Sequence, residues 1–495
     1  MPRIAVIGAG FGGLCMGIRL RQAGIDSFTI LEKADRLGGT WRDNTYPGAA
    51  CDSPAFAYCY SFEQKTDWSR KWSPQPEILG YMEHCARKYG LLPHIRFGTE
   101  IAGARFDPAA GVWRLRTAAG DTIEAEVVVS AVGQLNRPYT PALPGLEQFR
   151  GIALHSARWR HDVDLAGKRV AVIGNAASAI QFIPQIAPQV KRLLVFQRSA
   201  NWMIPKNDRV YGEDEKRRFA RFPLLARLYR WWLWLTYESR FPVFRQEPLM
   251  SRALARVAER SMREQVADPA LQRALLPDYP IGGKRILISD DYYQALCREN
   301  VEVVTAPIER LTEGGIVTAD GRTTPVDVVI FATGFETTSF LVPMRIEGLQ
   351  GRVLEEVWKG GAEAYLGVAV AGFPSFFMLY GPNTNLGHNS IIFMLECQVS
   401  YVMSCLRALR ERDLAWLDVR PEAMREYNAR LQAVLARSVW ARTERSWYKR
   451  ADGRITNNWC GTTVAYWWRT RRLVLAHYHQ QARASQAEAA VARVA

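Results

Sequence analysis

The sequence lacks closely paired cysteines. Its eight cysteines are scattered over 495 residues, and none forms a C-x-x-C pair. This absence argues against a zinc site, so no metal ligands are assigned, and against a thioredoxin-like redox pair. A flavin disulfide reductase is also disfavoured, because the first predicted helix contains no C-x4-C pair.

The sequence has no long run of basic residues, although its formal net charge is +15. Without five or six consecutive basic residues, no nucleic-acid partner is expected. A membrane surface or a site that gathers phosphate-bearing cofactors equally explains the excess of positive charge. No charged and apolar leader precedes the first predicted strand, so a cytoplasmic location is the default expectation.

The sequence also lacks an uncharged apolar run of the roughly twenty residues that a membrane-spanning helix needs. The most membrane-like stretch is Phe222–Phe244, which contains Trp231–Leu235 and is interrupted by Arg227, Arg230 and Arg240. We interpret it as a buried or capping helix. The alternative is an interfacial helix that gives peripheral membrane contact.

What the sequence does contain is two strand–turn–helix–strand units, each with a glycine-rich turn. The first unit consists of strand Ile4–Ile7, loop Gly8–Gly13, helix Leu14–Ala23 and strand Ser27–Leu31. The second consists of strand Lys168–Ile173, a turn at Gly174, helix Ser178–Ile186 and strand Arg192–Phe196. Further strands are expected at Val127–Val129, Val301–Val304 and Val326–Phe331. The pattern predicts an α/β protein with two Rossmann-like dinucleotide-binding domains.

The chain is long enough for two or three domains. The prolines at 138, 141 and 144 mark the first predicted boundary. We expect an FAD-binding domain over 1–145, an NADPH-binding domain over 146–340 with a helical insertion at about 210–276, and a return to the first domain over 341–482. Residues 483–495 form an Ala-rich tail, expected to be frayed or disordered.

The first glycine motif has the features of an FAD or NAD site. Gly8, Gly10 and Gly13 satisfy G-x-G-x-x-G between a strand and a helix. Such glycines allow a tight turn, close approach of the backbone to pyrophosphate, and close packing of helix on strand. Glu32 ends the second strand, where an acid accepts ribose hydroxyls and its charge repels a 2′-phosphate.

The second motif departs from the first. Gly174 keeps the turn, Ala176 replaces the middle glycine, and Ser178 opens the helix. The methyl group of Ala176 is expected to push the pyrophosphate outward slightly. Arg198 follows the returning strand in place of an acid, and its guanidinium suits a 2′-phosphate, so this site is predicted to bind NADPH. The alternative is that Arg198 is a surface cation.

Three further patterns carry a family resemblance. The linker between the units reads Phe149, Gly151, His155, Trp159, which matches F-x-G-x-x-x-H-x-x-x-W, with Arg160 where the pattern has Pro or Asp. The second pattern is G-G-x-W followed by Y-P-G and an aspartate, and it consists of Gly38, Gly39, Trp41, Tyr46, Pro47, Gly48 and Asp52. The third is the segment Gly381-Pro382-Asn383. With Lys284 and Arg285, the sequence resembles the type I Baeyer–Villiger monooxygenases, in the class B flavoprotein monooxygenase family.

The resemblance implies an NADPH- and O2-dependent enzyme that converts a ketone to an ester or lactone through a C4a-peroxyflavin. Arg285 would hold the negatively charged oxygen, Asp52 would orient Arg285, and Lys284 would join Arg198 at the 2′-phosphate. Further residues implied at the flavin are Gly39, Thr40, Trp41 and Asp52. Asn383, Asn385 and His388 would position a loop near the flavin. His155 would couple the two domains, or serve as a hydrogen-bonded structural residue.

Rival functions remain open at this point. An S- or N-oxygenating flavin monooxygenase that takes a sulfide shares both nucleotide sites, and so does an uncoupled NADPH oxidase. A nucleotide-binding protein without activity is a third alternative, with Ala176 as the lesion. The sequence does not identify the ketone, the selectivity or the oligomeric state.

Overall fold

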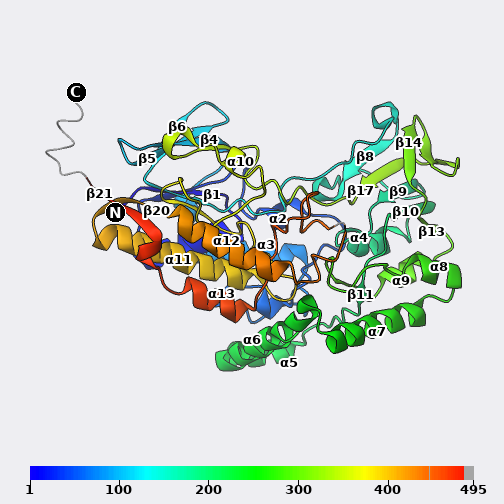
Figure 1. Cartoon of the computed structure of the whole chain (residues 1–495). Coiled ribbons are helices and arrows are strands. Elements are labelled where there is room, and N and C mark those ends of the chain that lie inside the picture. Colours follow the sequence, from blue (N-terminus) through cyan, green and yellow to red (C-terminus); the bar gives the residue numbers. More distant parts are fainter. Residues whose placement is uncertain (445, 484–495) are drawn as a thin grey trace.

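Two five-stranded parallel sheets dominate the computed structural model, which describes residues 1–444 and 446–483 (Figure 1). The first has the order β19-β7-β1-β2-β3, with bounds β1 Ile4–Ile7, β2 Phe28–Leu31, β3 Ile95–Arg96, β7 Val127–Ser130 and β19 Phe376–Met378. The second has the order β13-β10-β9-β17-β8, with bounds β8 Ile152–His155, β9 Arg169–Ile173, β10 Arg192–Phe196, β13 Val301–Val304 and β17 Val328–Phe331. The predicted α/β class with two Rossmann-type sheets is confirmed.

Four smaller sheets complete the β structure. One contains β4 Ile101–Asp107, β5 Val112–Thr117, β6 Thr122–Ala125 and β18 Arg345–Glu347; another contains β14 Ile308–Thr312, β15 Gly315–Thr318 and β16 Thr323–Pro325. The two-stranded sheets pair β11 Met203–Ile204 with β12 Leu287–Ile288, and β20 Leu414–Val419 with β21 Tyr478–Ala482.

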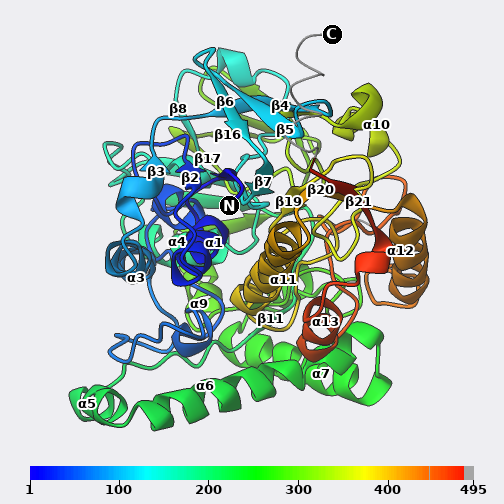
Figure 2. The ribbon, with the colours of Figure 1, turned by 90° about the vertical axis from the view of Figure 1, so that its left-hand side faces the viewer.

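The helices cover the sheets and form a separate layer below them in Figures 1 and 2. Their bounds are α1 Phe11–Gln22, α2 Thr40–Asp43, α3 Gln75–Lys88, α4 Ala179–Ile186, α5 Glu213–Arg221, α6 Pro223–Glu238, α7 Pro248–Gln265, α8 Pro269–Ala274, α9 Tyr292–Leu296, α10 Leu354–Val357, α11 Ile391–Glu411, α12 Pro421–Leu435 and α13 Thr463–Thr470. The short 3-10 turns are η1 Ala55–Ala57, η2 Leu92–His94, η3 Leu146–Gln148, η4 Ser156–Arg158, η5 Phe241–Arg245, η6 Leu349–Gly351 and η7 Leu475–His477.

The first predicted unit is present, but its helix begins earlier than expected. The prediction placed residues 11–13 in the loop, whereas α1 begins at Phe11, directly after the N-cap Gly10. Gly13 lets the first turn of the helix lie close to the strand, because a Cβ there would lie 1.8 Å from the carbonyl oxygen of Gly8. The predicted strands at 4–7, 192–196 and 301–304 are confirmed with their bounds, and the others differ by one or two residues at an end.

The predicted helical insertion is confirmed as four helices, α5 to α8. Pro223, Pro248 and Pro269 each begin a helix, where the missing N–H costs no hydrogen bond. The interpretation of Phe222–Phe244 as buried is wrong for one side of α6, because Trp231 and other large apolar side chains there are exposed. A Trp- and Leu-rich composition does not reveal which side of a helix faces solvent.

One helix within the described residues is long and apolar enough to cross a membrane, by length and composition only. This helix, α11, has 61% of its most apolar window buried. It packs against α1, α13 and β20, as the core helix of a globular domain does. The predicted tail lies, from residue 484 onward, outside the described residues.

Candidate active site

A cavity of about 1320 Å³ lies between the two large sheets. It exceeds the roughly 300–1,000 Å³ of a pocket for one small ligand, so it has room for more than one. Most of the predicted site residues line it, namely Gly8, Gly10, Glu32, Gly39, Thr40, Trp41, Asp52, Ala176, Ser178, Arg198, Lys284 and Arg285. Gly13, Gly174 and the four linker residues do not.

The first glycine turn has the geometry that a dinucleotide requires. Gly8 has φ of +103°, and a Cβ added there would lie 2.9 Å from the carbonyl oxygen of Ala131. A Cβ at Gly13 would lie 1.8 Å from the carbonyl oxygen of Gly8, so only glycine lets α1 pack this closely on β1. A Cβ at Gly10 would meet no atom within 4 Å, which leaves open space above the turn.

The N-terminus of α1 faces that open space without a protein partner for its positive end. Gly10 is the N-cap, its helix has no side-chain cap, and the first turn has no acidic residue. A helix N-terminus attracts anions through its N–H groups and its dipole. The turn and the helix therefore fit the pyrophosphate of FAD.

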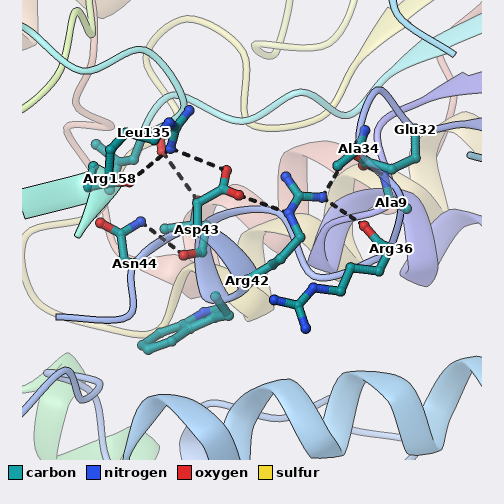
Figure 3. A network of polar contacts seen from close by, with 12 residues as sticks. Ala9, Glu32, Ala34, Arg36, Arg42, Asp43, Asn44, Leu135 and Arg158 are labelled. Atoms are coloured by element: carbon teal, nitrogen blue, oxygen red, sulfur yellow. Dashed lines mark hydrogen bonds and ion pairs between the residues drawn. The ribbon is translucent and has the colours of Figure 1, made fainter. Parts of the chain in front are cut away.

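Glu32 lies buried at the end of β2 and forms a network with Arg42 (Figure 3). Its carboxylate accepts hydrogen bonds from the backbone N–H of Ala9 at 2.8 Å and of Ala34 at 3.0 Å, and from Arg42 Nη1 at 2.9 Å. A carboxylate has about four acceptor positions, so about one remains for a ribose hydroxyl.

Arg42 was not predicted from the sequence, and it changes the charge balance of this site. Its guanidinium also donates hydrogen bonds to Asp43 and to the carbonyl oxygen of Arg36. Figure 3 shows this guanidinium between the carboxylates of Glu32 and Asp43. Because Arg42 neutralises Glu32, repulsion by Glu32 is a weaker reason to exclude a 2′-phosphate than the sequence suggested. The position of Arg42 directly after the G-G-x-W pattern is the only sequence signal for it.

The second glycine turn repeats the geometry of the first. Gly174 has φ of +105°, and a Cβ there would lie 2.5 Å from the carbonyl oxygen of Ala332. Ala176 is exposed in the cavity wall, and Ser178 precedes α4. Asn175, also missed by the sequence reasoning, donates hydrogen bonds to Gln197 at 2.8 Å and to the carbonyl of Ser199 at 3.0 Å.

Two cations line the cavity beside this turn. Lys284 Nζ donates to the hydroxyl of Ser199 at 2.8 Å and lies 4.3 Å above the ring of Tyr279. Burial lowers the pKa of Lys284; the charge of Asp278 acts in the opposite direction, and the nearby Arg198 lowers the pKa further. Among the residues that the structure describes, neither Lys284 nor Arg198 has a carboxylate within ion-pair distance. Two neighbouring positive charges without an acidic partner fit a phosphate group.

Arg285 and Asp52 lie against each other in the cavity wall. Arg285 Nε donates to Asp52 Oδ2 at 2.7 Å, and a second guanidinium nitrogen contacts the same oxygen. The adjacent Asp52 raises the pKa of Arg285, so the guanidinium stays charged. About a third of the Arg285 side chain, 34%, remains exposed toward the cavity.

Backbone geometry fixes the position of Lys284 and Arg285. Gly282 has φ of +89°, and a Cβ at Gly283 would lie 2.0 Å from the hydroxyl oxygen of Thr443. Two glycines are thus needed for the chain to pass this point and present the two cations side by side.

The four linker residues lie outside the cavity wall. A Cβ at Gly151 would lie 2.4 Å from the ring of Phe149, and the ring of Trp159 packs at a tilted angle against Phe182, with 5.3 Å between the centroids. His155 is buried, its Nδ1 accepts the N–H of Ala157 at 3.0 Å, and burial lowers its pKa. Its Nε2 has no hydrogen-bond partner within the described chain.

The Y-P-G segment joins the two sheets. Tyr46 donates its hydroxyl hydrogen to Gln181 Oε1 at 2.9 Å, and Gln181 Nε2 donates to the carbonyl of Ala50 at 3.0 Å. A Cβ at Gly48 would lie 2.6 Å from the carbonyl oxygen of Gln181. Because Gln181 belongs to α4, this segment holds the second nucleotide unit against the first.

The Gly-Pro-Asn loop is anchored to the chain that precedes α13. Asn383 donates to the carbonyls of Ile455 and Asn458, and Asn385 Nδ2 donates to Asn458 Oδ1 at 2.6 Å. Tyr380, which the sequence reasoning missed, donates to Asn385 Oδ1 at 2.7 Å and lines the cavity. Asn385 also lines the cavity, whereas Asn383 and His388 lie behind it.

Comparisons with known proteins identify the family of the chain. The model of the flavin-binding monooxygenase-like family matches residues 1–353. The chain is 45% identical over 478 residues to a Baeyer-Villiger monooxygenase of Streptomyces coelicolor, covering 96% of this chain and 92% of that protein. It is 44% identical to a Baeyer-Villiger monooxygenase of Pseudomonas aeruginosa, covering 96% and 91%.

Solved structures of monooxygenases are also similar to this chain over nearly its whole length. An oxidized steroid monooxygenase bound to NADP matches with a TM-score of 0.88 and 32% identity, covering 97% of this chain and 100% of that one. A closed structure of cyclohexanone monooxygenase matches with a TM-score of 0.86 and 27% identity, covering 97% and 99%. The structure of OTEMO in complex with FAD and NADP matches with a TM-score of 0.87 and 26% identity, also covering 97% and 99%.

Proposed function

The chain belongs to the flavin-binding monooxygenase-like family, and on that premise we propose that it inserts one oxygen atom beside the carbonyl of a ketone, giving an ester or lactone. It is an enzyme that uses FAD and NADPH. The overall reaction consumes the ketone, O2, NADPH and a proton, and yields the ester, NADP⁺ and water. When bound, FAD supplies the activation of O2 after reduction by NADPH.

We assign FAD to the first glycine turn. Gly8, Gly10 and the N-terminus of α1 would hold its pyrophosphate, and Glu32 would accept a ribose hydroxyl. The open space at Gly10 supports this assignment, because protein atoms leave that approach clear. Gly39, Thr40 and Trp41 line the same end of the cavity, as proposed flavin contacts.

We assign NADPH to the second turn. Arg198 and Lys284 would hold its 2′-phosphate, and Gly174, Ala176 and Ser178 would lie at its pyrophosphate. The domain division at residues 145, 340 and 482 follows from these assignments and stays a proposal. The predicted cytoplasmic location is likewise a proposal.

Arg285 is the proposed catalytic residue, and Asp52 is its positioning residue. The observation that carries the proposal is the Arg285–Asp52 pair, at 2.7 Å in a cavity that both glycine turns line. The guanidinium would stabilise negative charge on oxygen as the bond to the carbonyl carbon forms. One such preorganised donor contributes about 3 to 4 kcal/mol. Asp52 offsets the cost of holding that cation partly buried.

The test is Arg285→Ala, with Arg160→Ala as the matched control because Arg160 is exposed and paired with Asp162. We expect Arg285→Ala to reduce its flavin with NADPH at close to the wild-type rate and to lose ester formation by about a hundredfold or more. Stopped-flow absorbance measures the first step and product analysis the second. Ketone oxidation at the wild-type rate would assign the role to another residue.

A sulfide assayed beside linear, cyclic and aryl ketones separates this proposal from heteroatom oxygenation. NADPH consumption and product are measured together, so that uncoupled oxidation is recognised. Sulfoxide formation with no ester from any ketone would overturn the proposal while leaving the FAD and NADPH assignments intact.

A further inference from the structure

Helix α6 has one apolar side that the protein leaves uncovered. Each of the residues along it keeps between 50% and 65% of its surface exposed: Phe222, Leu224, Leu228, Trp231, Trp232 and Leu235. The residues after Leu224 follow it by four, seven, eight and eleven positions, which places them in one stripe along the helix. We call this stripe the α6 face.

The other side of α6 is firmly attached to the protein. Ala226 and Leu233 are buried, and Tyr229 packs edge-on against Phe56 at 5.2 Å between ring centroids. Arg230 Nη1 donates to the carbonyls of Phe56 at 2.7 Å and Cys59 at 2.9 Å. The α6 face is therefore presented by a fixed helix.

The surroundings of the α6 face are basic. Residues 216–246 contain eight basic residues and one acidic residue, Glu238. The three acidic residues that begin α5, at 213–215, form ion pairs with Lys216, Arg217 and Arg209. Glu238 does not expose its charge at this surface, because its carboxylate accepts hydrogen bonds from Asn389 at 2.8 Å and from the backbone N–H of Thr463 at 2.6 Å. Arg221 and Arg227 are exposed beside the apolar side chains.

A second helix adds exposed tryptophans on the same side of the molecule. Val464, Trp467 and Trp468 are exposed on α13, and the guanidinium of Arg471 lies 3.2 Å above the ring of Trp468. The bond between Thr463 and Glu238 ties the start of α13 to the end of α6. In Figures 1 and 2, α5, α6 and α7 run along the lower edge, with α13 just above them.

We propose that the α6 face docks the protein on the surface of an anionic lipid bilayer, with α6 lying in the plane of the membrane. Tryptophan and leucine on one side of a helix, flanked by arginine, suit the boundary between headgroups and acyl chains. With 16 residues and two internal arginines, α6 is too short and too charged to cross a bilayer. This docking goes beyond the oxygenation reaction and does not depend on it.

The charge around the α6 face favours a membrane over a second copy of the chain. A twofold contact between two α6 faces would place the exposed Arg221 and Arg227 of both copies close together, without an exposed carboxylate on the helix to balance them. An anionic bilayer supplies the opposite charge, and each basic residue near its surface adds to attraction that salt weakens.

Vesicle flotation of the FAD-loaded full chain tests the proposal. Vesicles of about three parts phosphatidylcholine to one part phosphatidylglycerol are compared with phosphatidylcholine alone. We expect the wild type to float with the anionic vesicles, and to float less with neutral vesicles or at about 1 M salt, where charges are screened beyond about 3 Å. The double variant Trp231→Gln, Trp232→Gln should partition at least about tenfold less.

The matched control is Val357→Gln with Val434→Gln, two exposed apolar positions on α10 and α12. It should float like the wild type, and both double variants should keep the wild-type flavin content and NADPH oxidation rate, which shows that they fold. The proposal is overturned if the wild type stays unbound, or if the Trp231 and Trp232 variant floats equally well. It is also overturned if light scattering shows a wild-type dimer that this variant converts to a monomer, which assigns the face to a second copy.

Discussion

Arg285 keeps its charge because Asp52 lies 2.7 Å away, while burial acts in the opposite direction. Nearby tyrosines contribute no competing charge at neutral pH, since burial raises the pKa of Tyr448 to about 12. An arginine with a raised pKa stays protonated at neutral pH. The pH dependence of the reaction should therefore come from other groups than Arg285.

Arg198 is the residue on which coenzyme choice should depend. Arg198→Ala removes one of the two cations assigned to the 2′-phosphate, and a charge-assisted hydrogen bond contributes about 1.5 to 3 kcal/mol. We expect the preference for NADPH over NADH, measured as the ratio of kcat/KM values, to fall between about tenfold and a hundredfold.

The control for this change is Arg192→Ala, at the other end of β10, where the arginine pairs with Glu302. It should leave the coenzyme ratio unchanged. If Arg198→Ala leaves that ratio unchanged too, the phosphate contact belongs to another residue.

Asp418 should make the protein less stable as the pH rises. It is buried on β20, and burial raises its pKa from 3.8 to about 7 even though both carboxylate oxygens accept the N–H of Gly372. Above about pH 4 the unfolded chain loses this proton while the folded chain retains it, so stability falls until the pH passes about 7. The loss is at most about 4 kcal/mol, from a shift of about three pKa units.

Asp418→Asn keeps one acceptor oxygen for Gly372 and removes the buried charge. Urea unfolding at pH 5 and pH 8 should show a smaller difference between the two conditions in Asp418→Asn than in the wild type. The exposed Asp214→Asn serves as the control. Equal pH dependence in wild type and Asp418→Asn would show that Asp418 titrates normally.

At the scale of single elements, the two glycine turns show why the same short pattern recurs. In both, a glycine with positive φ lies against the backbone oxygen of a neighbouring strand end, Ala131 for Gly8 and Ala332 for Gly174. The parallel strands bring their carboxyl ends to one edge, so each turn lies where ligands bind in such sheets. The element itself thus creates the site, before any side chain is considered.

Helix α1 provides a sharp test of this packing, because its two adjacent glycines differ. Gly13→Ala would place a Cβ 1.8 Å from the carbonyl oxygen of Gly8, so the helix must move; we expect a cost of about 3 kcal/mol or more and loss of bound FAD. Gly12→Ala would place a Cβ at ordinary contact, 3.5 Å from Ala131 and Leu379.

Gly12→Ala should therefore keep its flavin and change stability by no more than about 1 kcal/mol. Flavin absorbance of the purified proteins and thermal unfolding measure both effects. Similar behaviour of the two variants would mean that α1 tolerates a shift relative to β1.

Across the whole molecule, the sequence predicted the features that depend on local patterns better than those that depend on contacts between distant segments. The strand–glycine–helix–strand units span about thirty residues each, so their periodicity and turn residues identify them in the sequence. Family patterns identified Asp52 and Arg285, which lie 233 residues apart and meet in the structure. For α6 the sequence left a buried or capping helix and an interfacial helix as alternatives, because composition does not show which side of a helix is exposed.

Side-chain contacts that only the tertiary fold creates could not be predicted from the sequence. Arg42 reaches Glu32 because the loop after β2 turns back over the glycine turn, and no periodicity encodes that path. The pairing of Asn385 with Asn458 joins segments 73 residues apart. Side chains such as these become visible only when the direction of each loop is known.

Gly48 tests how the two nucleotide units are coupled across the molecule. Gly48→Ala forces a Cβ to within 2.6 Å of the carbonyl oxygen of Gln181 on α4, at a residue with φ of +78°. Gly24→Ala imposes the same kind of backbone strain, with φ of +69°, but meets no atom within 4 Å. Both variants carry the cost of a left-handed residue, about 1 to 2 kcal/mol, whereas only Gly48→Ala displaces the second unit from the first.

Hydride transfer from NADPH to the flavin needs the two cofactors at close range, and a misplacement of about 1 Å can cost about a hundredfold in rate. We therefore expect Gly48→Ala to retain FAD and to slow flavin reduction between about tenfold and a hundredfold, while Gly24→Ala reduces at the wild-type rate. Anaerobic stopped-flow absorbance measures both. Equal rates in the two variants would show that the contact between Gly48 and α4 does not set the distance between the cofactors, and the coupling would then fall to Tyr46 and its hydrogen bond with Gln181.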